Sequence, residues 1–174
     1  MVAIKKKQKT TIWQTVKLSM SKALFTLKNK FKKAFMEVAE TFAALSHAER
    51  KKVGSIIVKD NRIISIGYNG MPTGWDNVCE TRDIHDYGNT TPVYGLTTKP
   101  EVLHAEANAI SKVARSNEST EGAEIFCTAM PCIDCAKLIH QSGIKKVYYK
   151  EDYKANVGYG RPFLEKCEIE LEQI

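Results

Sequence analysis

The sequence predicts an α/β fold in which a mixed sheet carries helices on both faces. Two runs rich in β-branched residues stand on either side of Asp60-Asn61, and further along the chain strand-like and helix-like segments alternate. Strands joined by a two-residue turn are antiparallel, whereas strands joined through a helix are usually parallel. We therefore expect a sheet that begins with an antiparallel hairpin and is parallel in its second half.

The composition is that of one ordinary globular domain. Of the 174 residues, 43% are hydrophobic and 26% are charged, which excludes a disordered chain and provides enough core for folding without disulfides. No apolar run is long enough to cross a bilayer, and the Lys-rich start lacks the apolar block of a secretory signal. These features predict a cytoplasmic protein with no membrane partner.

The formal net charge of +6 originates at the N-terminus, where residues 1–33 contain ten lysines and no acid. Residues 34–174 carry 16 Lys+Arg against 20 Asp+Glu, a balance of −4. Apolar residues recur every three or four positions from Ile12 to Leu45, which predicts one long helix or two in tandem. We predict a Lys-rich helical extension over residues 1–33 and a functional domain over residues 34–174. Docking of the helix on its own domain or on a neighbouring subunit is favoured over binding to a membrane or nucleic acid.

The elements of the domain follow in chain order. Residues 53–59 and 62–67 form the predicted hairpin, because Asp and Asn favour a tight turn. Residues 68–100, rich in Gly, Pro, Asn, Asp and Thr, are typical of a long functional loop. The later predicted elements are a helix over 103–115, a strand over 124–128, a helix over 132–141 ended by Gly143, and strands over 145–149 and 167–171.

Two short motifs carry the chemistry. His104-Ala105-Glu106 opens one predicted helix, and Pro131-Cys132-Ile133-Asp134-Cys135 opens another. One imidazole and two thiolates provide three zinc ligands, and three is the number found in catalytic sites, where a water molecule takes the fourth position. A carboxylate two residues beyond the histidine can face that position and move protons. The motifs predict His104, Cys132 and Cys135 as ligands of one catalytic Zn²⁺, with Glu106 as the catalytic residue.

Other interpretations of these residues are weaker. Cys132 and Cys135 alone could form a thioredoxin-like redox pair. A structural zinc site would need a fourth ligand, and this interpretation leaves Glu106 without a task. The residues available for that fourth position are Cys79, His85, His47 and His140. We interpret His140, Cys127 and Cys167 as packing residues, because they fall within predicted regular elements.

The motifs resemble the signature of the zinc-dependent nucleoside and nucleotide deaminases, His-x-Glu followed by Pro-Cys-x-x-Cys. Within that superfamily the chain resembles the deoxycytidylate (dCMP) deaminase family, and a phage or viral member in particular, over about residues 34–172. The resemblance rests on HAEANAI (104–110), PCIDCAKLIHQSGIKKVYY (131–149), RKKVGSIIVKDNRIISIGYNGMPTG (50–74) and NVCE (77–80).

The resemblance implies a three-layer α/β/α sandwich with a five-stranded sheet, the cytidine deaminase fold. It implies hydrolysis of dCMP to dUMP and ammonia, which supplies dUMP for dTTP synthesis, in the cytoplasm of the host if the source is viral. By resemblance, Asn69 contacts the deoxyribose hydroxyl, the Ala105 backbone reads the pyrimidine carbonyl, and Tyr153 packs against the sugar and base.

The resemblance also implies regulation, with dCTP and Mg²⁺ as activator, dTTP as inhibitor and a homo-oligomer, a hexamer, as the assembly. The residues that match regulatory or subunit-contact positions are Arg50, Tyr68, Gly70 and Arg115. Residues 46–49 lack the cysteine that some phage members use for a second, structural zinc, so we predict a single zinc ion.

Three alternatives to a dCMP-specific enzyme stay open at the level of sequence. A dCTP deaminase, or one that accepts both dCMP and dCTP, would share the same motifs. A deaminase of tRNA or single-stranded nucleic acid would also share them, but nucleic acid is not the expected partner because the domain is net acidic. A zinc-binding interaction module would need no catalytic Glu106.

Overall fold

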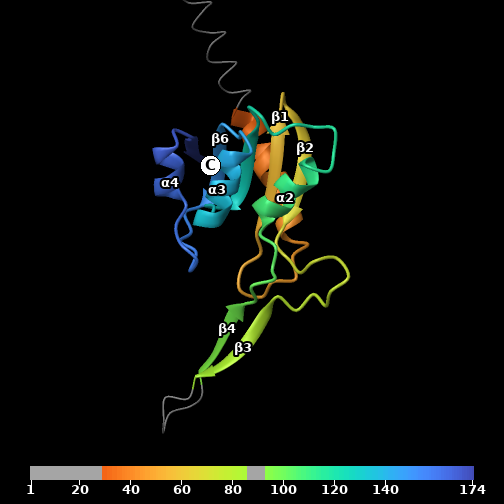
Figure 1. Ribbon diagram of the computed structural model, residues 1–174, viewed down its shortest axis with the longest axis vertical. Helices are drawn as coiled ribbons and strands as arrows, with labels where there is room; N and C mark the ends of the chain where they lie inside the picture. Colours follow the sequence, from red (N-terminus) through yellow and green to blue (C-terminus); the bar gives the residue numbers. More distant parts are fainter. Residues whose placement is uncertain (1–28, 86–92) are drawn as a thin grey trace, which may run out of the picture. The chain divides into compact units, whose positions relative to one another are not determined.

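The computed structural model describes residues 29–85 and 93–174. Its main sheet has five strands in the order β2-β1-β5-β6-β7 (Figure 1). Strand β1 is antiparallel to both β2 and β5, whereas β5, β6 and β7 are mutually parallel. The predicted mixed sheet, with its initial hairpin and parallel second half, is confirmed. The strands are β1 (Gly54–Lys59), β2 (Arg62–Tyr68), β5 (Glu124–Ala129), β6 (Lys146–Glu151) and β7 (Glu170–Gln173).

The turn between β1 and β2 has the geometry that its sequence predicts. Asp60 and Asn61 both have positive φ, 49° and 59°. Two consecutive residues of positive φ are required by the type I′ turn, whose twist matches that of the flanking strands, and Asp and Asn tolerate this conformation well. The turn therefore sets the pairing of Lys59 with Arg62 at the end of the hairpin.

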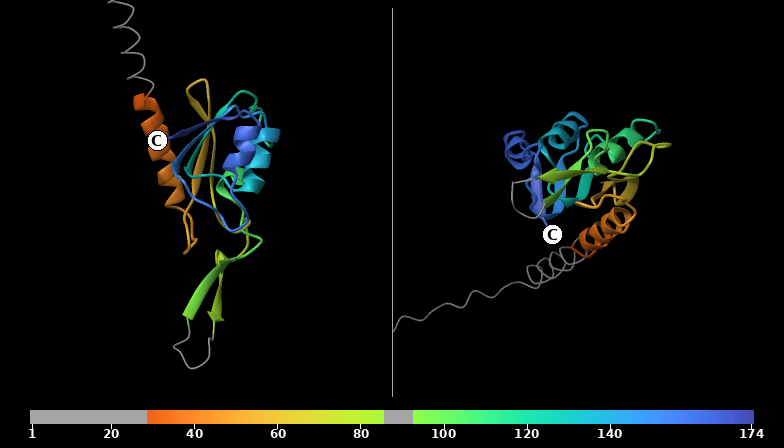
Figure 2. Two further views of the ribbon diagram at one scale, coloured as in Figure 1. Left: turned by 90° about the vertical axis from the view of Figure 1, so that its left-hand side faces the viewer. Right: turned by 90° about the horizontal axis from the view of Figure 1, so that it is seen from below.

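Each face of the sheet is covered by helices (Figure 2). On one face, Ile57 and Cys127 enter a core that α2 (Ala105–Val113), α3 (Ile133–Gln141) and α4 (Arg161–Lys166) cover. On the other face, Ile56 and Phe126 pack against residues 35–43 of a helix whose described part runs from residue 29 to 43. The alternation follows from the strand period of two, which sends neighbouring side chains to opposite faces.

The second half of the predicted loop is a hairpin. Strands β3 (Glu80–His85) and β4 (Val93–Thr98) pair with each other in a separate antiparallel sheet (Figure 1). Arg82, in β3, is exposed. The prediction of a loop over this segment was wrong because these strands lack the regular alternation of apolar and polar residues that marks a half-buried strand.

Two details near the C-terminus also differ from the sequence-based expectation. Helix α4 is six residues long, too short for a helical period to be visible in the sequence. The last strand spans Glu170–Gln173 and not residues 167–171, because Glu168 turns the chain with a φ of 57°. Among the described helices, none combines the length and apolar character needed to span a membrane. Most of the predicted N-terminal extension, residues 1–33, lies outside the described residues.

The topology brings two strand ends to the same edge of the sheet. Because β1 is antiparallel to both of its neighbours, β2 and β5 run in the same direction, and both end beside Gly54, the first residue of β1. The Gly54 N–H donates to Thr128 Oγ1 at 3.0 Å. The segments that leave β2 and β5 therefore start close together.

The stability of this arrangement depends on a close contact at Gly67. A Cβ at this position would lie 2.1 Å from the Ala105 carbonyl oxygen and 2.7 Å from the Ala109 nitrogen, both in the backbone of α2. We predict that Gly67→Ala lowers the free energy of unfolding by about 1–3 kcal/mol, because backbone atoms cannot move aside as a flexible side chain can. Urea unfolding measures the effect.

Gly70→Ala is the matched control, since a Cβ at Gly70 meets nothing within 4 Å. Its free energy of unfolding is expected to stay within about 0.5 kcal/mol of the parent value. Equal stability of the two variants would contradict the proposed tight contact between β2 and α2.

Candidate active site

The first metal ligand lies at the start of α2. His104 is the N-cap residue of this helix, with extended φ and ψ of −73° and 151°. Leu103, just before it, forms an antiparallel bridge with Gly70, through N···O distances of 2.9 and 3.1 Å. Asn108 Nδ2 donates to the Tyr68 carbonyl at 3.1 Å. These bonds tie the start of α2 to the end of β2 and fix the position of the histidine.

The two thiol ligands lie at the start of α3, which follows β5. Cys132 is the N-cap residue, and its Sγ accepts a hydrogen bond from the Cys135 N–H at 3.5 Å. Cys135 lies in the first turn of the helix. Both side chains are almost fully buried, with 4% and 2% of their residue surface exposed. The helix N-terminus favours negative charge and so supports thiolates at both positions.

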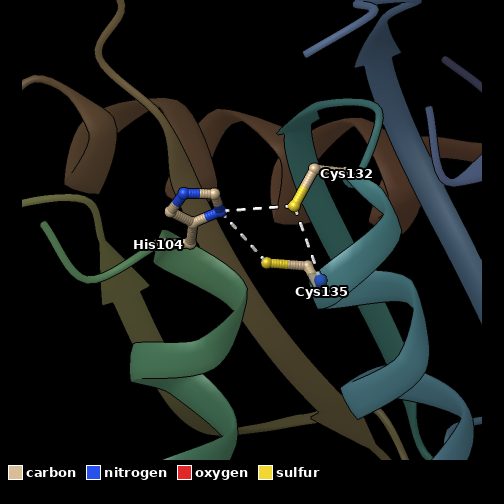
Figure 3. A group of neighbouring side chains, drawn as sticks. All are labelled: His104, Cys132 and Cys135. Atoms are coloured by element: carbon tan, nitrogen blue, oxygen red, sulfur yellow. Dashed lines mark hydrogen bonds between the residues drawn. The ribbon is translucent and has the colours of Figure 1, made fainter. Parts of the chain in front are cut away.

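The three side chains converge on one point (Figure 3). Each sulfur lies 3.4 Å from His104 Nδ1, and the three candidate ligand atoms all lie within 4.8 Å of one another. Tetrahedral zinc with bonds of 2.0–2.3 Å places its ligand atoms about 3.6 Å apart. The nitrogen and two sulfurs therefore fit zinc in both chemistry and spacing, and they leave a fourth position for water or substrate.

The protonation of the pair favours metal binding. A hydrogen bond from the Cys135 side chain, together with one from His104, lowers the pKa of Cys132 to about 4. The same bond to Cys132, together with burial, raises the pKa of Cys135. Zinc takes cysteines as thiolates, so its binding displaces the protons that the pair carries.

Glu106 lies beside these ligands, in the first turn of α2. Its residue surface is only 4% exposed, and burial raises the pKa of its carboxyl above the usual range. It borders a cavity of about 140 Å³ together with His104 and Cys132. The other lining residues are Arg50, Lys51, Val53, Asn69, Thr98, Val102, Ala105, Ala129, Met130, Tyr153, Ala155, Asn156 and Val157.

The three sequence-predicted substrate residues, Asn69, Ala105 and Tyr153, all line this cavity. Asn69 also holds the chain that precedes β1. Its Oδ1 accepts from the Val53 N–H at 2.8 Å, and its Nδ2 donates to the Lys51 carbonyl at 2.9 Å. An amide Nδ2 carries two hydrogens, so this residue can support the cavity wall and still donate to a ligand.

The four residues that match regulatory positions lie in different places. Arg50 lines the cavity and donates to Thr98 Oγ1 at 2.8 Å. Tyr68 ends β2, and Gly70 pairs with Leu103. Arg115 is exposed just beyond the far end of α2, and its N–H donates to the Lys112 carbonyl at 3.2 Å. The structure thus brings Arg50 to the predicted metal site, whereas Arg115 lies at the opposite end of the helix that His104 caps.

Sequence reasoning missed much of the cavity wall, including two parts that border Tyr153. Lys51 places its ammonium 4.7 Å from the centre of the Tyr153 ring and pairs with Glu151. In the sequence it belongs to the run Arg50-Lys51-Lys52, and no sequence feature indicates which of the two lysines faces the cavity. The second part is the segment from Ala155 to Val157, which follows Tyr153, the last site residue that the resemblance indicated.

Comparison with known proteins identifies the family. Residues 29–151 match the model of the cytidine and deoxycytidylate deaminase zinc-binding region. This match covers well over half of the chain, and it includes the three grouped ligands His104, Cys132 and Cys135. The chain belongs to this family and is a zinc-dependent deaminase whose described residues include a His/Cys/Cys zinc site.

Individual relatives place the chain near the dCMP deaminases. It is 38% identical to ComE operon protein 2 of Bacillus subtilis over 144 residues, 80% of this chain and 69% of the relative. It is also 38% identical to the deoxycytidylate deaminase of phage T4, over 60% of this chain and 69% of the relative. The dCMP deaminase of cyanophage S-TIM5, solved with dCMP and dUMP, is 42% identical with a TM-score of 0.73, covering 83% of this chain and 97% of that one.

The metal site makes a direct prediction about zinc content. The purified protein is expected to hold one zinc per chain, and Cys135→Ser is expected to lose it, because a hydroxyl is a poor replacement for a thiolate ligand. Removal of zinc by a chelator should also lower the midpoint of thermal unfolding, since the metal binds the folded state preferentially. Elemental analysis and calorimetry measure the two effects.

Cys167→Ser is the control, because Cys167 is half-buried and lies at the end of α4. It should keep its zinc. If both serine variants retained one zinc per chain, Cys135 would not be a ligand.

Proposed function

We propose that this chain hydrolyses dCMP to dUMP and ammonia and so supplies dUMP for dTTP synthesis. The observation that carries the proposal is a buried carboxylate, Glu106, beside three zinc ligands in a cavity that two cationic side chains, Arg50 and Lys51, also line. The similarity to a dCMP deaminase solved with dCMP and dUMP supports this choice of substrate.

Each residue has a defined task in this reaction. When bound, zinc activates water for attack at C4 of cytosine. Glu106 takes a proton from the attacking water on a carboxylate oxygen and delivers it to N3 of the ring. It then takes the second proton from the hydroxyl on C4 and delivers it to the amine, which leaves as ammonia. Burial excludes competing water around this carboxylate. The Ala105 backbone contacts the pyrimidine carbonyl, and Asn69 contacts the deoxyribose hydroxyl. Tyr153 packs against the face of the sugar and base.

In this proposal the 5′-phosphate of dCMP binds to the side chains of Arg50 and Lys51. Both side chains line the cavity on the segment just before β1, and a phosphate is well matched to a guanidinium and an ammonium. This assigns Arg50 to the substrate and leaves Tyr68, Gly70 and Arg115 as the residues proposed for regulation. Activation by dCTP with Mg²⁺, inhibition by dTTP and assembly into a hexamer complete the proposal.

Ultraviolet detection of deamination tests the substrate. We expect turnover of dCMP to exceed that of dCTP, deoxycytidine and a short adenosine-bearing RNA, with activation by dCTP·Mg²⁺ and inhibition by dTTP. Turnover of dCMP without a response to either nucleotide would contradict the regulatory part alone. Turnover of dCTP or RNA in preference to dCMP would contradict the substrate.

Glu106→Gln tests the proton shuttle. The amide cannot accept and release a proton, so kcat for dCMP should fall by about 10²- to 10⁴-fold, while zinc content and dCMP affinity stay near the parent values. Steady-state kinetics, elemental analysis and calorimetric titration measure these three quantities. Glu118→Gln, at a carboxylate that pairs with Arg62 on the surface, is the matched control and should keep full activity.

Arg50→Ala and Lys51→Ala test the phosphate contact. Each should raise the KM for dCMP by about 10-fold or more, the value of a hydrogen bond to a charged group, and leave turnover of deoxycytidine unchanged. Lys52→Ala is the control, since Lys52 is exposed and outside the cavity wall. If Arg50→Ala changed only the response to dCTP, the regulatory assignment of this arginine would stand instead.

A further inference from the structure

A polar cluster behind the cavity centres on the guanidinium of Arg161, the first residue of α4. Its Nε donates to the Tyr159 hydroxyl at 2.6 Å, and its Nη2 donates to the Tyr149 hydroxyl at 2.5 Å. Nη2 also lies 3.3 Å from Asp152 Oδ2, and the Tyr159 hydroxyl donates to the same carboxylate. One side chain therefore joins strand β6, helix α4 and both ends of the segment that connects them.

The connecting segment, residues 152–160, forms one wall of the cavity through Tyr153, Ala155, Asn156 and Val157. In the described structure it forms no helix or strand, so its own backbone hydrogen bonds fix only part of its course. Its position therefore depends on contacts with other parts of the chain, namely Lys51 at the Tyr153 ring and the bonds at its two ends.

The far end of the segment lies against the turn that carries the thiol ligands. Tyr159 forms an antiparallel bridge with Cys132. Gly160 N–H donates to the Pro131 carbonyl at 3.2 Å, and Ile133 N–H donates to the Gly158 carbonyl at 3.2 Å. The Tyr159 backbone thus lies directly beside the start of α3, and Arg161 holds the side chain of the same residue.

We propose that Arg161 is a positioning residue for the substrate: it holds residues 152–160 against the cavity, and so sets the place of Tyr153 opposite the base. Arg161 acts through Tyr159 and Asp152 and is not itself among the residues that line the cavity. The position of the segment follows from these contacts alone. The effect on dCMP binding rests on the proposed function.

The geometry calls for arginine. A guanidinium is planar and presents several N–H groups in fixed directions, so it can serve two hydroxyls and a carboxylate at once, whereas an ammonium is a point charge on a flexible stem. Arg161 also lies 5.1 Å from the Tyr149 ring centre and 5.9 Å from the Tyr159 ring centre, within the range of cation–π attraction. Lysine is therefore expected to restore the function only in part.

Hydrogen exchange and kinetics on the zinc-loaded protein test the proposal. In Arg161→Ala, the amides of residues 152–160 should exchange at least 10-fold faster, while those of β5 keep the parent rate. The KM for dCMP should rise about 10-fold with kcat changed less than 3-fold, and zinc should stay at one per chain. Arg161→Lys should lie between alanine and the parent, and Tyr159→Phe, which removes one hydroxyl, should shift both quantities in the same direction.

Glu165→Gln is the matched control. Glu165 pairs with Arg161 from within α4 at 3.8 Å and makes no link to the segment, so exchange and KM should match the parent. Unchanged exchange of residues 152–160 in both Arg161→Ala and Tyr159→Phe would overturn the proposal. So would faster exchange with an unchanged KM in a protein that turns over dCMP. If the parent protein did not deaminate dCMP at all, the proposed function would fail, and the exchange measurement would still decide whether Arg161 holds the segment.

Discussion

The contact between β2 and α2 at Gly67 determines where the first zinc ligand lies. With no side chain at this position, the backbone of α2 approaches the strand so closely that a Cβ would come within 2.1 Å of a carbonyl oxygen. Ser65 adds a hydrogen bond from its hydroxyl to the Ala109 carbonyl at 2.7 Å. A helix that lay further out, on a bulkier residue, would move His104 away from the cysteines.

The zinc site also requires that strands β2 and β5 end side by side. Because β2 and β5 both flank β1 and run in the same direction, the chain leaves both strands at one edge of the sheet. One exit leads, through the pairing of Gly70 with Leu103, to His104, and the other leads directly to Cys132. Ligands that stand 28 positions apart in the sequence are thereby placed 3.4 Å apart. The metal then joins two helix starts that the sheet has already positioned.

The parts of the structure that were predictable from sequence are those in which local chemistry and packing agree. Asp60-Asn61 indicated its turn, and buried strands such as β5 are continuous apolar runs between polar boundaries. The zinc ligands were predictable because thiolates and imidazole at two helix starts have few other uses. Strands β3 and β4 were not, since a two-stranded sheet with an exposed surface imposes no periodic pattern on its residues.

The cavity wall could not be predicted for a related reason. The role of Lys51 depends on which way one of three consecutive basic side chains points, and spacing in the sequence carries no information about that. The residues of 152–160 are placed by Tyr159 and Arg161, at the end of the segment and beyond it. Contacts of this kind are made between elements and not along one, so only the folded chain reveals them.

The distribution of charge shows why overall composition misleads about the partner. The chain as a whole is basic, yet residues 34–174 carry a net charge of −4, and within that acidic domain two cations, Arg50 and Lys51, line the cavity. Arg50 contacts Thr98 and Lys51 contacts Glu151, so an incoming phosphate has to reach the N–H donors that these partners leave open. A small anion that enters the cavity can do so, because attraction at short range depends on the nearest charges and on the low dielectric of a pocket wall. A long polyanion would also meet the rest of residues 34–174, which are net acidic, and this difference favours a single nucleotide over a nucleic-acid strand as the molecule that reaches Glu106.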